Sequence, residues 1–309
     1  MSVNFEYYKI FYYVAKYQNI TKAACVLKNS QPNVSRTIRL LESQLNCQLF
    51  IREPRGLRLT QCGERLYSHV EIACHHLLNA EEELNFMETD CKGTVEIGVT
   101  ETALHLFLLQ TLYDFKLNYP EIKIKIKNDS TPELLKALMN GEIDFAILTT
   151  PFTPSKRLHC EKILEFHETL AGGTEYSKVA TRKMTLDEIC AYPLIGLSKG
   201  TATYEFYKTV FLKQHLDYRP DMEVATSDLM LPLLQNNLGI GFVAEALAAP
   251  LFQKNCLVKI DLDLELPVRE VQIASEKGRG KSRATDTFYK YLKTRKEDDD
   301  HMAVSHPVM

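Results

Sequence analysis

Long hydrophobic runs are missing from this chain of 309 residues. It contains no run of eighteen apolar residues, and this argues against a membrane-spanning helix and a membrane partner. Its first residues, MSVNFEYYKIF, lack a basic segment followed by an apolar one, which is the pattern of a secretory signal. We therefore expect a cytoplasmic protein.

Cysteine motifs are missing as well. The eight cysteines contain no CxxC pair and no clustering with histidine at metal-ligand spacing, so we expect no metal site. In a reducing compartment such cysteines are expected to be small buried hydrophobic residues. A redox pair such as Cys160 with Cys190 stays open as an alternative, although no spacing supports it.

The common catalytic signatures are also missing. The sequence has no GxSxG, no P-loop, no GxGxxG and no HExxH. The single pair Gly172-Gly173 is too short to cradle a phosphate. We expect neither an enzyme nor a bound cofactor.

Charge, by contrast, is present and unevenly spread. Residues 1–60 carry nine Lys/Arg against three acids, whereas residues 61–90 carry one arginine against seven acids. A basic N-terminal segment of this kind suggests a polyanion as partner, although charge alone does not exclude an ordinary solvated surface.

The stretch NSQPNVSRTIRLLESQL, residues 29–45, predicts an amphipathic helix. Ser30 is placed to cap its start, and Pro32 is tolerated in a first turn. An apolar stripe follows at four-three-four spacing, made of Val34, Ile38, Leu41 and Leu45. The opposite face carries Arg36 and Arg39 and no acid, so this helix is expected to be buried on one side and basic on the other.

Two shorter helices are predicted before it. Residues 5–17 form the first, and Thr21 is placed to cap the second, TKAACVLK, whose paired alanines allow close packing. A short helix, a tight turn and a helix with a basic outer face make the pattern of a helix-turn-helix. The segment QLFIREPRGLRLT then alternates apolar and basic residues around residues 54–56, which predicts a hairpin, the wing.

This arrangement predicts binding to double-stranded DNA. The major groove admits one helix, and arginines suit both base edges and phosphates, while short polar groups near the helix start can reach the bases. Thr21, at a helix N-terminus, suits a phosphate. The predicted DNA-binding residues are Thr21, Ser30, Gln31, Pro32, Asn33, Ser35, Arg36, Arg39, Arg52, Arg55 and Arg58.

The order of motifs in this segment resembles the N-terminal DNA-binding domain of LysR-type transcriptional regulators. The shared features are Ala23-Ala24, Ser30-Gln31-Pro32, Ser35-Arg36 followed by Leu41-Glu42, then Leu49-Phe50, Arg52, and Leu59-Thr60 with Gly63. The match is free of gaps and far more specific than a generic helix-turn-helix. Asn33 and Thr37 depart from the pattern, and we expect them to tune the operator rather than the fold.

A further helix, capped by Thr60, is predicted to run to about Thr89. Its apolar residues recur at alternating steps of four and three, the spacing of a coiled-coil seam. The seam consists of Leu66, Val70, Ala73, Leu77, Ala80, Leu84 and Met87. A helix packed on its own domain is the alternative. The resemblance implies that this helix pairs two subunits, which then read an operator with approximate dyad symmetry.

From Gly93 the pattern changes to alternating strands and helices, which predicts two α/β lobes. The first lobe has strands at 95–99, 122–126 and IDFAIL, with helices ending before Pro120 and at Gly141. The second has helices TLDEICAY and SDLMLPLLQN, a helix ending near His215, and strands PLIGL, MEVAT and GIGFV; residues 285–293 form a last helix. The two lobes resemble the periplasmic-binding-protein-like effector domain of the same family.

Short hydroxyl residues gather where these strands end, at the edge where open α/β sheets bind ligands. The predicted ligand-binding residues are Thr100, Thr102, Ser130, Thr131, Thr149, Thr201, Thr203 and Ser227. Positions matching five of them commonly line the inducer pocket of the resembled family. Hydroxyls and free helix N–H groups suit a small carboxylate, but Ser and Thr are also ordinary helix caps. Lys199 and His167 are the candidate charged contributors.

The chain as a whole is therefore predicted to be α/β, with a winged helix-turn-helix at 1–60 and a linker or dimerisation helix at 61–90. A two-lobed effector-binding domain follows at 91–295, with lobe 1 at about 91–162 and 267–295 and lobe 2 at about 163–266. Residues 296–309 are predicted to be a disordered tail, because their sequence, KEDDDHMAVSHPVM, is polar.

The resemblance implies a sequence-specific regulator, a homodimer or homotetramer, in which a small-molecule inducer between the lobes changes DNA bending and access of RNA polymerase. Two alternatives stay open. One is a thiol-based redox sensor, and the weaker one is an enzyme with a DNA-binding regulatory head.

Overall fold

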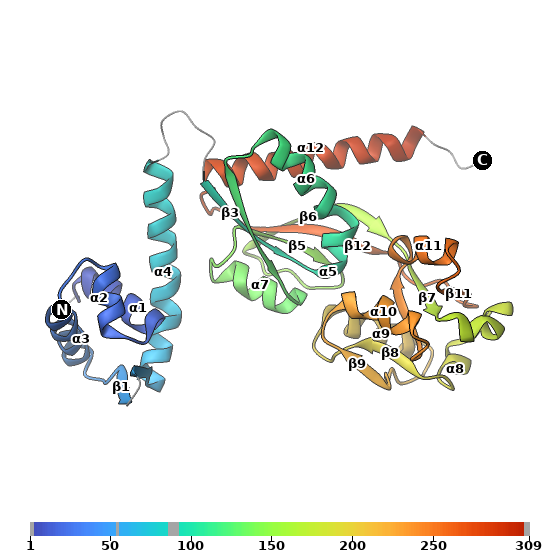
Figure 1. Ribbon diagram of the computed structural model, residues 1–309, viewed down its shortest axis with the longest axis horizontal. Coiled ribbons are helices and arrows are strands. Elements are labelled where there is room, and N and C mark those ends of the chain that lie inside the picture. The colour runs from blue at the N-terminus through green and yellow to red at the C-terminus, as the bar shows by residue number, and fades with distance from the viewer. Residues whose placement is uncertain (1–2, 54–55, 86–92, 306–309) are drawn as a thin grey trace. The chain divides into compact units, whose positions relative to one another are not determined.

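The protein is described by a computed structural model that covers residues 3–53, 56–85 and 93–305. It divides into two compact units, Met1–Met87 and Glu88–Met309 (Figure 1). We call the first unit the head and the second the effector half. The mixture of helices and strands confirms the α/β class predicted from the sequence.

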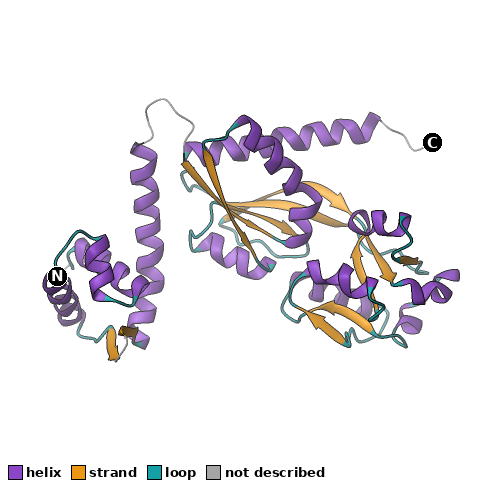
Figure 2. Ribbon diagram, viewed as in Figure 1, coloured by secondary structure: helices purple, strands orange, loops and turns teal. Residues whose placement is uncertain are grey.

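The head consists of three helices, a hairpin and one long helix (Figure 2). In chain order these are α1 (Phe5–Tyr17), α2 (Ile20–Val26), α3 (Gln31–Leu45), β1 (Phe50–Glu53), β2 (Gly56–Leu59) and α4 (Gln61–Asn85). Strands β1 and β2 pair antiparallel, which confirms the predicted hairpin. The core is made of side chains with no exposed surface, among them Phe11, Val14, Ala23, Val34 and Leu41.

The helix starts differ in part from the prediction. Helix α2 begins at Ile20, because the side chain of Asn19 accepts a hydrogen bond from the N–H of Lys22 at 3.0 Å. The prediction that Thr21 caps this helix is therefore wrong. Ser30 does occupy the N-cap position of α3, but its hydroxyl makes no capping hydrogen bond.

The start of α4 is fixed to the loop that precedes the wing. The hydroxyl of Thr60 accepts from the N–H of Gly63 at 3.0 Å, which is the predicted cap, and donates to the carbonyl of Gln48 at 2.7 Å. A Cβ atom at Gly63 would lie 2.2 Å from the carbonyl oxygen of Leu49, so only glycine allows this close approach.

The predicted coiled-coil seam divides into two parts. Leu66 and Val70 belong to the core of the head, and this favours the alternative of a helix packed on its own domain over this stretch. Ala73 and Leu77 are exposed, with Leu77 at 45%. The side chains of Ala80 and Leu84, and all of Met87, lie outside the described residues.

The effector half contains two mixed five-stranded sheets, one in each lobe. Lobe 1 has the strand order β4-β3-β5-β12-β6 and lobe 2 the order β11-β7-β10-β8-β9. The strands of lobe 1 are β3 (Gly93–Val99), β4 (Ile122–Asn128), β5 (Phe145–Thr149), β6 (Leu158–Phe166) and β12 (Arg269–Glu276). Those of lobe 2 are β7 (Glu168–Gly172), β8 (Leu194–Leu197), β9 (Met222–Val224), β10 (Ile240–Ala244) and β11 (Val258–Ile260).

Helices cover these sheets. In lobe 1 they are α5 (Glu101–Ala103), the π-helical turn η1 (Leu104–Leu108), α6 (Leu109–Asn118), α7 (Thr131–Met139) and α12 (Arg283–Ser305). In lobe 2 they are η2 (Thr174–Thr181), α8 (Leu186–Ile189), α9 (Ala202–Lys213), η3 (Ser227–Leu229), α10 (Met230–Gln235) and α11 (Glu245–Gln253). None of the described helices combines the length and hydropathy that crossing a bilayer requires.

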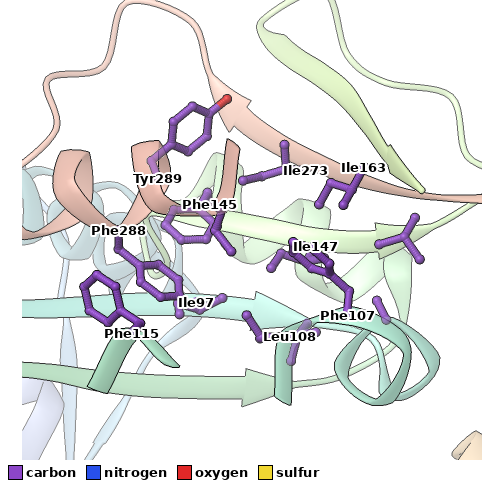
Figure 3. Packing of buried hydrophobic residues seen from close by; sticks show 14 of the residues in the cluster. Ile97, Phe107, Leu108, Phe115, Phe145, Ile147, Ile163, Ile273, Phe288 and Tyr289 are labelled. Atoms are coloured by element: carbon purple, nitrogen blue, oxygen red, sulfur yellow. The ribbon is translucent and has the colours of Figure 1, made fainter. Parts of the chain in front are cut away.

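Aromatic side chains join α6 and α12 to the sheet of lobe 1 (Figure 3). The rings of Phe115 and Phe288 meet edge to face with centroids 4.5 Å apart, and Phe145 of β5 stacks on Phe288 at 5.9 Å. Ile97 and Ile147 complete this layer, both fully buried. The last helix of the chain thus packs on lobe 1.

Two parts of the effector half differ from the sequence-based prediction. Strands β6, β7, β11 and β12 pair antiparallel and were not predicted, because the alternating pattern of strand and helix points only to parallel pairs. Residues 296–305 continue helix α12, so their prediction as a disordered tail is wrong. The segment is polar but has no glycine or proline to end a helix. Residues 306–309 lie outside the described residues.

The two lobes are joined at a buried arginine. The chain crosses from lobe 1 to lobe 2 between β6 and β7 and returns at β12, where Arg269 pairs in register with Phe166. Arg269 is 2% exposed. Its Nη1 forms an ion pair with Glu168, whose side chain is also buried, and its Nε donates to the carbonyl of Thr150 at 2.7 Å.

The same guanidinium also contacts α9 of lobe 2. Nη2 donates to the hydroxyl of Thr203 at 3.0 Å. The guanidinium lies over the ring of Phe166 at 5.3 Å and over that of Phe206 at 5.0 Å. Because Thr150 and Phe166 belong to lobe 1 and the other partners to lobe 2, Arg269 holds the lobes together.

Arg269→Met should lower the free energy of unfolding of the effector half by about 3–5 kcal/mol, because it leaves Glu168 buried without its partner. The double variant Arg269→Met/Glu168→Leu should recover most of that loss, because it leaves no buried charge. Urea denaturation of the full chain, followed by circular dichroism, measures both. Equal losses in the single and the double variant would contradict this role of the pair.

Candidate functional site

The outer face of α3 carries the predicted DNA-binding residues of that helix. Arg36 and Arg39 are exposed, as are Gln31, Pro32 and Asn33, while Ser35 is half-buried. The apolar stripe faces inward: Val34 and Leu41 have no exposed surface, and Ile38 has 7%. One side of the helix is thus fixed by the core of the head, and the other presents two guanidinium groups to solvent.

Thr37 does not belong to this face. It is 6% exposed, and its hydroxyl donates to the carbonyl of Asn33 at 3.0 Å. The prediction that Thr37 tunes the operator is therefore wrong. Thr37 and Ile38 lie three and four residues after the buried Val34, so both fall on the same inner side of the helix. Asn33 stays on the exposed face, where its side-chain amide donates to Asn29 Oδ1 at 2.9 Å.

The wing is anchored to α3 by Glu42. Its carboxylate accepts from the N–H of Leu49 at 2.8 Å and from that of Phe50, the first residue of β1, at 3.2 Å. On the wing itself Arg52 is exposed, and Arg58 is exposed with its Nε 3.0 Å from Glu53. Arg55 lies outside the described residues. Thr21 and Ser30 are both exposed.

In the effector half, all eight predicted ligand-binding residues line one small cavity of about 50 Å³, which we call the hydroxyl cleft. They are Thr100, Thr102, Ser130, Thr131, Thr149, Thr201, Thr203 and Ser227. The cleft lies between the lobes, because Thr102 of α5 and Ser227 of η3 meet across it with their hydroxyls 3.2 Å apart. Sequence separation between these two residues is 125, so only the fold brings them together.

Helices α7 and α9, one from each lobe, both begin at the hydroxyl cleft. Ser130 is the N-cap of α7 and Thr201 the N-cap of α9. The hydroxyl of Thr201 accepts from the N–H of Tyr204 at 3.1 Å, whereas that of Ser130 makes no capping hydrogen bond. First-turn N–H groups and an uncommitted hydroxyl are donors that suit an anion.

Thr100 gives an independent sign that the hydroxyl cleft is built for a ligand. Its side chain is 8% exposed, and its Oγ1 is buried with no hydrogen-bond partner. A buried hydroxyl without a partner destabilises a fold by about 1–3 kcal/mol. A ligand that hydrogen-bonds to this hydroxyl would remove that penalty.

A second and larger cavity, of about 470 Å³, adjoins the hydroxyl cleft, and we call it the apolar cavity. Most of its wall is hydrophobic, from α10, β10 and α11, and includes Met230, Leu231, Pro232, Phe242, Val243, Leu247 and Leu251. Its polar lining includes Glu101, His105, Glu168, Asp228 and Arg269. Five residues line both cavities: Glu101, Thr102, Leu197, Thr203 and Ser227.

The charged residues of this site were not predicted. Glu101 directly follows Thr100 at the end of β3, so the same strand-end signal could have found it. Arg269 gives no such signal, because it lines the apolar cavity only through the return of the chain at β12. Lys199 and His167, the charged contributors that the sequence suggested, line neither cavity among the described residues.

The described cysteines form no disulfide bond. All seven described cysteines are free, and Cys160 and Cys190 lie in different lobes. Within the described ranges, no group of three or more His, Cys, Asp or Glu is placed to hold a metal ion. In the head, burial and then contact with the Cys62 thiol raise the pKa of the Cys47 thiol.

Comparison with known families and proteins gives matches over both units. The family described as the LysR substrate binding domain matches residues 90–297, and that described as a bacterial regulatory helix-turn-helix protein of the lysR family matches residues 5–64. The chain is 26% identical over 261 residues to the HTH-type transcriptional regulator cbl of Escherichia coli, covering 84% of this chain and 82% of that protein. It is 25% identical over 290 residues to the uncharacterized HTH-type transcriptional regulator YybE of Bacillus subtilis, covering 94% and 98%.

Solved structures share the fold at lower identity. A full-length OxyR variant from Pseudomonas aeruginosa superposes with a TM-score of 0.68 at 16% identity, covering 94% of this chain and 98% of that one. CbnR, a LysR family transcriptional regulator, gives 0.66 at 17% identity with coverage of 94% and 99%. CbnR complexed with its target DNA gives 0.54 at 18% identity, with coverage of 95% and 100%.

Thr100→Val should raise the free energy of unfolding by about 1 kcal/mol, because it removes a buried hydroxyl without a partner and keeps the shape of the side chain. Thr111→Val is the matched control. The hydroxyl of Thr111 is buried and donates to the carbonyl of Phe107 at 3.0 Å, so its loss should lower the free energy by about 0.5–1.5 kcal/mol. Urea unfolding measures both changes, and a loss of stability in Thr100→Val like that in Thr111→Val would show that the Thr100 hydroxyl has a partner.

Proposed function

This chain belongs to the LysR family of transcriptional regulators, and from that membership we propose that its control of transcription responds to a small anionic effector bound in the hydroxyl cleft. The observation that carries the effector proposal is the unpartnered buried hydroxyl of Thr100, placed beside the N-termini of α7 and α9. A carboxylate fits these donors, since oxyanions accept hydrogen bonds from helix N–H groups and hydroxyls.

The head supplies the contact with double-stranded DNA. The exposed face of α3 enters the major groove, where Arg36 and Arg39 contact bases or phosphates, and the wing arginines Arg52 and Arg58 hold the neighbouring backbone. Arg55 extends the same basic row in the sequence. A solved complex of the similar protein CbnR with its target DNA supports DNA binding by this chain, and the residue roles are our proposal.

Two copies of the chain pair through α4 and read two half-sites of a dyad-like operator. Among the described side chains of the predicted seam, Ala73 and Leu77 are exposed and therefore open to a partner. A homodimer, or a homotetramer made of two such dimers, is the assembly that the family suggests. Its contact with RNA polymerase is indirect, through the bend that the assembly imposes on DNA.

The effector acts by changing the arrangement of the lobes. Thr102 and Ser227 bridge the lobes at 3.2 Å, and a ligand bound beside them would compete with or reinforce that bridge. The shift reaches the heads through the assembled subunits and alters DNA bending. We place this regulator in the cytoplasm, where its operator lies, and we assign it no enzymatic activity.

Substitution of Arg36 or Arg39 by Ala should weaken operator binding by about 1–3 kcal/mol for each base-reading contact. Gel shifts with DNA from upstream of the protein's own coding sequence, at fixed low salt, measure the loss. Arg219→Ala is the control, because Arg219 is an exposed arginine of the effector half, paired with Asp217 at 2.6 Å. If Arg219→Ala weakens binding as much as the two head variants do, the assignment of α3 as the recognition helix is wrong.

A thiol-based redox response is the second candidate function, and the contact between Cys47 and Cys62 favours it. Cys62 is exposed in the first turn of α4, and Cys47, which contacts it, is only partly exposed. The exposed thiol is the one that an oxidant in solution reaches first. A hydroperoxide would oxidise Cys62 to a sulfenic acid, and the Cys47 thiol would then displace water to form a disulfide.

Mild peroxide treatment should then remove two thiols from the full chain and change its affinity for DNA. Free-thiol titration of the wild-type chain and of Cys62→Ser measures this, with Cys25→Ser as the control, since Cys25 is also exposed in the head. A loss of thiols that is the same in all three proteins would exclude the redox function of this pair.

A further inference from the structure

The two adjoining cavities bring three different chemical environments next to one another. Hydroxyls and helix N-termini line the hydroxyl cleft together with the exposed Asp129, whose Oδ1 accepts from the N–H of Ser130 at 2.7 Å. Glu101 lines both cavities, and mostly hydrophobic side chains line the apolar cavity. A volume of about 470 Å³ is within the range of small-molecule sites in proteins. A single ligand that reaches both cavities would therefore need an anionic end, a polar middle and an apolar body.

The charges decide the nature of the middle group. The apolar cavity is lined by the three acids Glu101, Glu168 and Asp228. Arg269 is the cation among its described lining residues, and each of its nitrogens already donates to the protein, to Thr150, Glu168 and Thr203. The ion pair with Glu168 already balances the charge of Arg269, so Glu101 and Asp228 leave the lining of the apolar cavity negative. This disfavours a ligand anion in the apolar cavity and favours a ligand cation at its entrance.

Glu101 is suited to receive that cation. Its side chain is 19% exposed, and its Oε1 lies 2.8 Å from Nε2 of His105 while its Oε2 accepts from the amide of Asn128 at 2.9 Å. These two contacts fix the carboxylate at the junction of the cavities. Each carboxylate oxygen can accept a further hydrogen bond, so the group can also bind an ammonium.

We infer that the effector is an α-amino acid with a large apolar side chain, or a close analogue of one. Its carboxylate binds in the hydroxyl cleft, its ammonium pairs with Glu101, and its side chain fills the apolar cavity. In an α-amino acid the ammonium and the side chain leave the carbon next to the carboxylate, and this matches the position of Glu101 between the two cavities. The inference rests on the proposed effector function and names its ligand class.

Three probes separate the parts of this assignment. L-Phenylalanine carries all three groups, 3-phenylpropanoate lacks the ammonium, and 2-phenylethylamine lacks the carboxylate. Calorimetric titration of the full chain should show that an amino acid with a large apolar side chain binds more tightly than 3-phenylpropanoate and 2-phenylethylamine. L-Leucine and L-methionine are tested beside L-phenylalanine. Removal of either charged group should weaken binding by about tenfold or more, the usual effect of losing one charge-assisted hydrogen bond.

Two variants test the residues. Glu101→Gln should weaken binding of the amino acid about tenfold and leave that of 3-phenylpropanoate unchanged, whereas Ser130→Ala should weaken binding of both. Glu133→Gln is the control, because Glu133 is an acid on α7 whose side chain is 57% exposed and lines neither cavity. It should bind all probes like the wild-type chain.

Each contrary outcome has its own meaning. If 3-phenylpropanoate binds as tightly as the amino acid, the role of Glu101 is wrong while the proposed anionic effector stands. If 2-phenylethylamine binds as tightly, the hydroxyl cleft does not hold a carboxylate and the proposed effector function falls with the inference. If none of the amino acids binds at millimolar concentration, the ligand class is wrong, and the gel-shift result on the head is unaffected.

Discussion

A buried positive charge fixes the geometry of the effector half. Arg269 is buried, so each of its nitrogens needs an oxygen as partner, and the guanidinium also lies over the rings of Phe166 and Phe206. These partners come from both lobes. Their positions determine where the chain crosses between β6 and β7 and where β12 returns. Thr203, one of these partners, lines both the hydroxyl cleft and the apolar cavity. Both cavities thus depend on the arginine that joins the lobes.

Over its described residues, the head is stabilised by an apolar core and by closely packed helices, and not by a buried charge. The stripe of α3 is held by α1 and α2, and small residues such as Ala23 allow the short helix to pack closely. Glu42 and Thr60 then tie the wing and α4 to this core through backbone groups rather than through other side chains. Such contacts constrain the backbone and leave the outer side chains of α3 free to differ between relatives. This separates stability of the head from its choice of operator.

Local sequence was enough to predict much of this structure. Caps and periodicity gave α1, α3, the wing and the start of α4, because each depends on residues within a few positions of one another. The eight hydroxyl residues converge because parallel strands end at one edge of a sheet, which is a rule of topology. The antiparallel strands, the place of Arg269 and the apolar cavity depend on residues about a hundred positions apart, such as Arg269 and Glu168, and no local pattern encodes these. A helical repeat does not tell which neighbour covers it, so the sequence did not show that Thr37 is buried or that Leu66 and Val70 pack on the core of the head.

The attachment of α4 to the head has a mechanical consequence. Val70 and Cys74 lie in the same core as α1, and Thr60 and Gly63 lock the first turn, so the lower half of this helix cannot swivel against α3. A helix of 25 residues is roughly 37 Å long. Tilting its far end by a few degrees therefore displaces the DNA-reading surface by on the order of 2 Å, comparable to the length of one hydrogen bond. The long helix can therefore act as a lever arm. In the proposed dimer, a small rearrangement at the far end of α4 is sufficient to change how two such heads match the turns of a double helix.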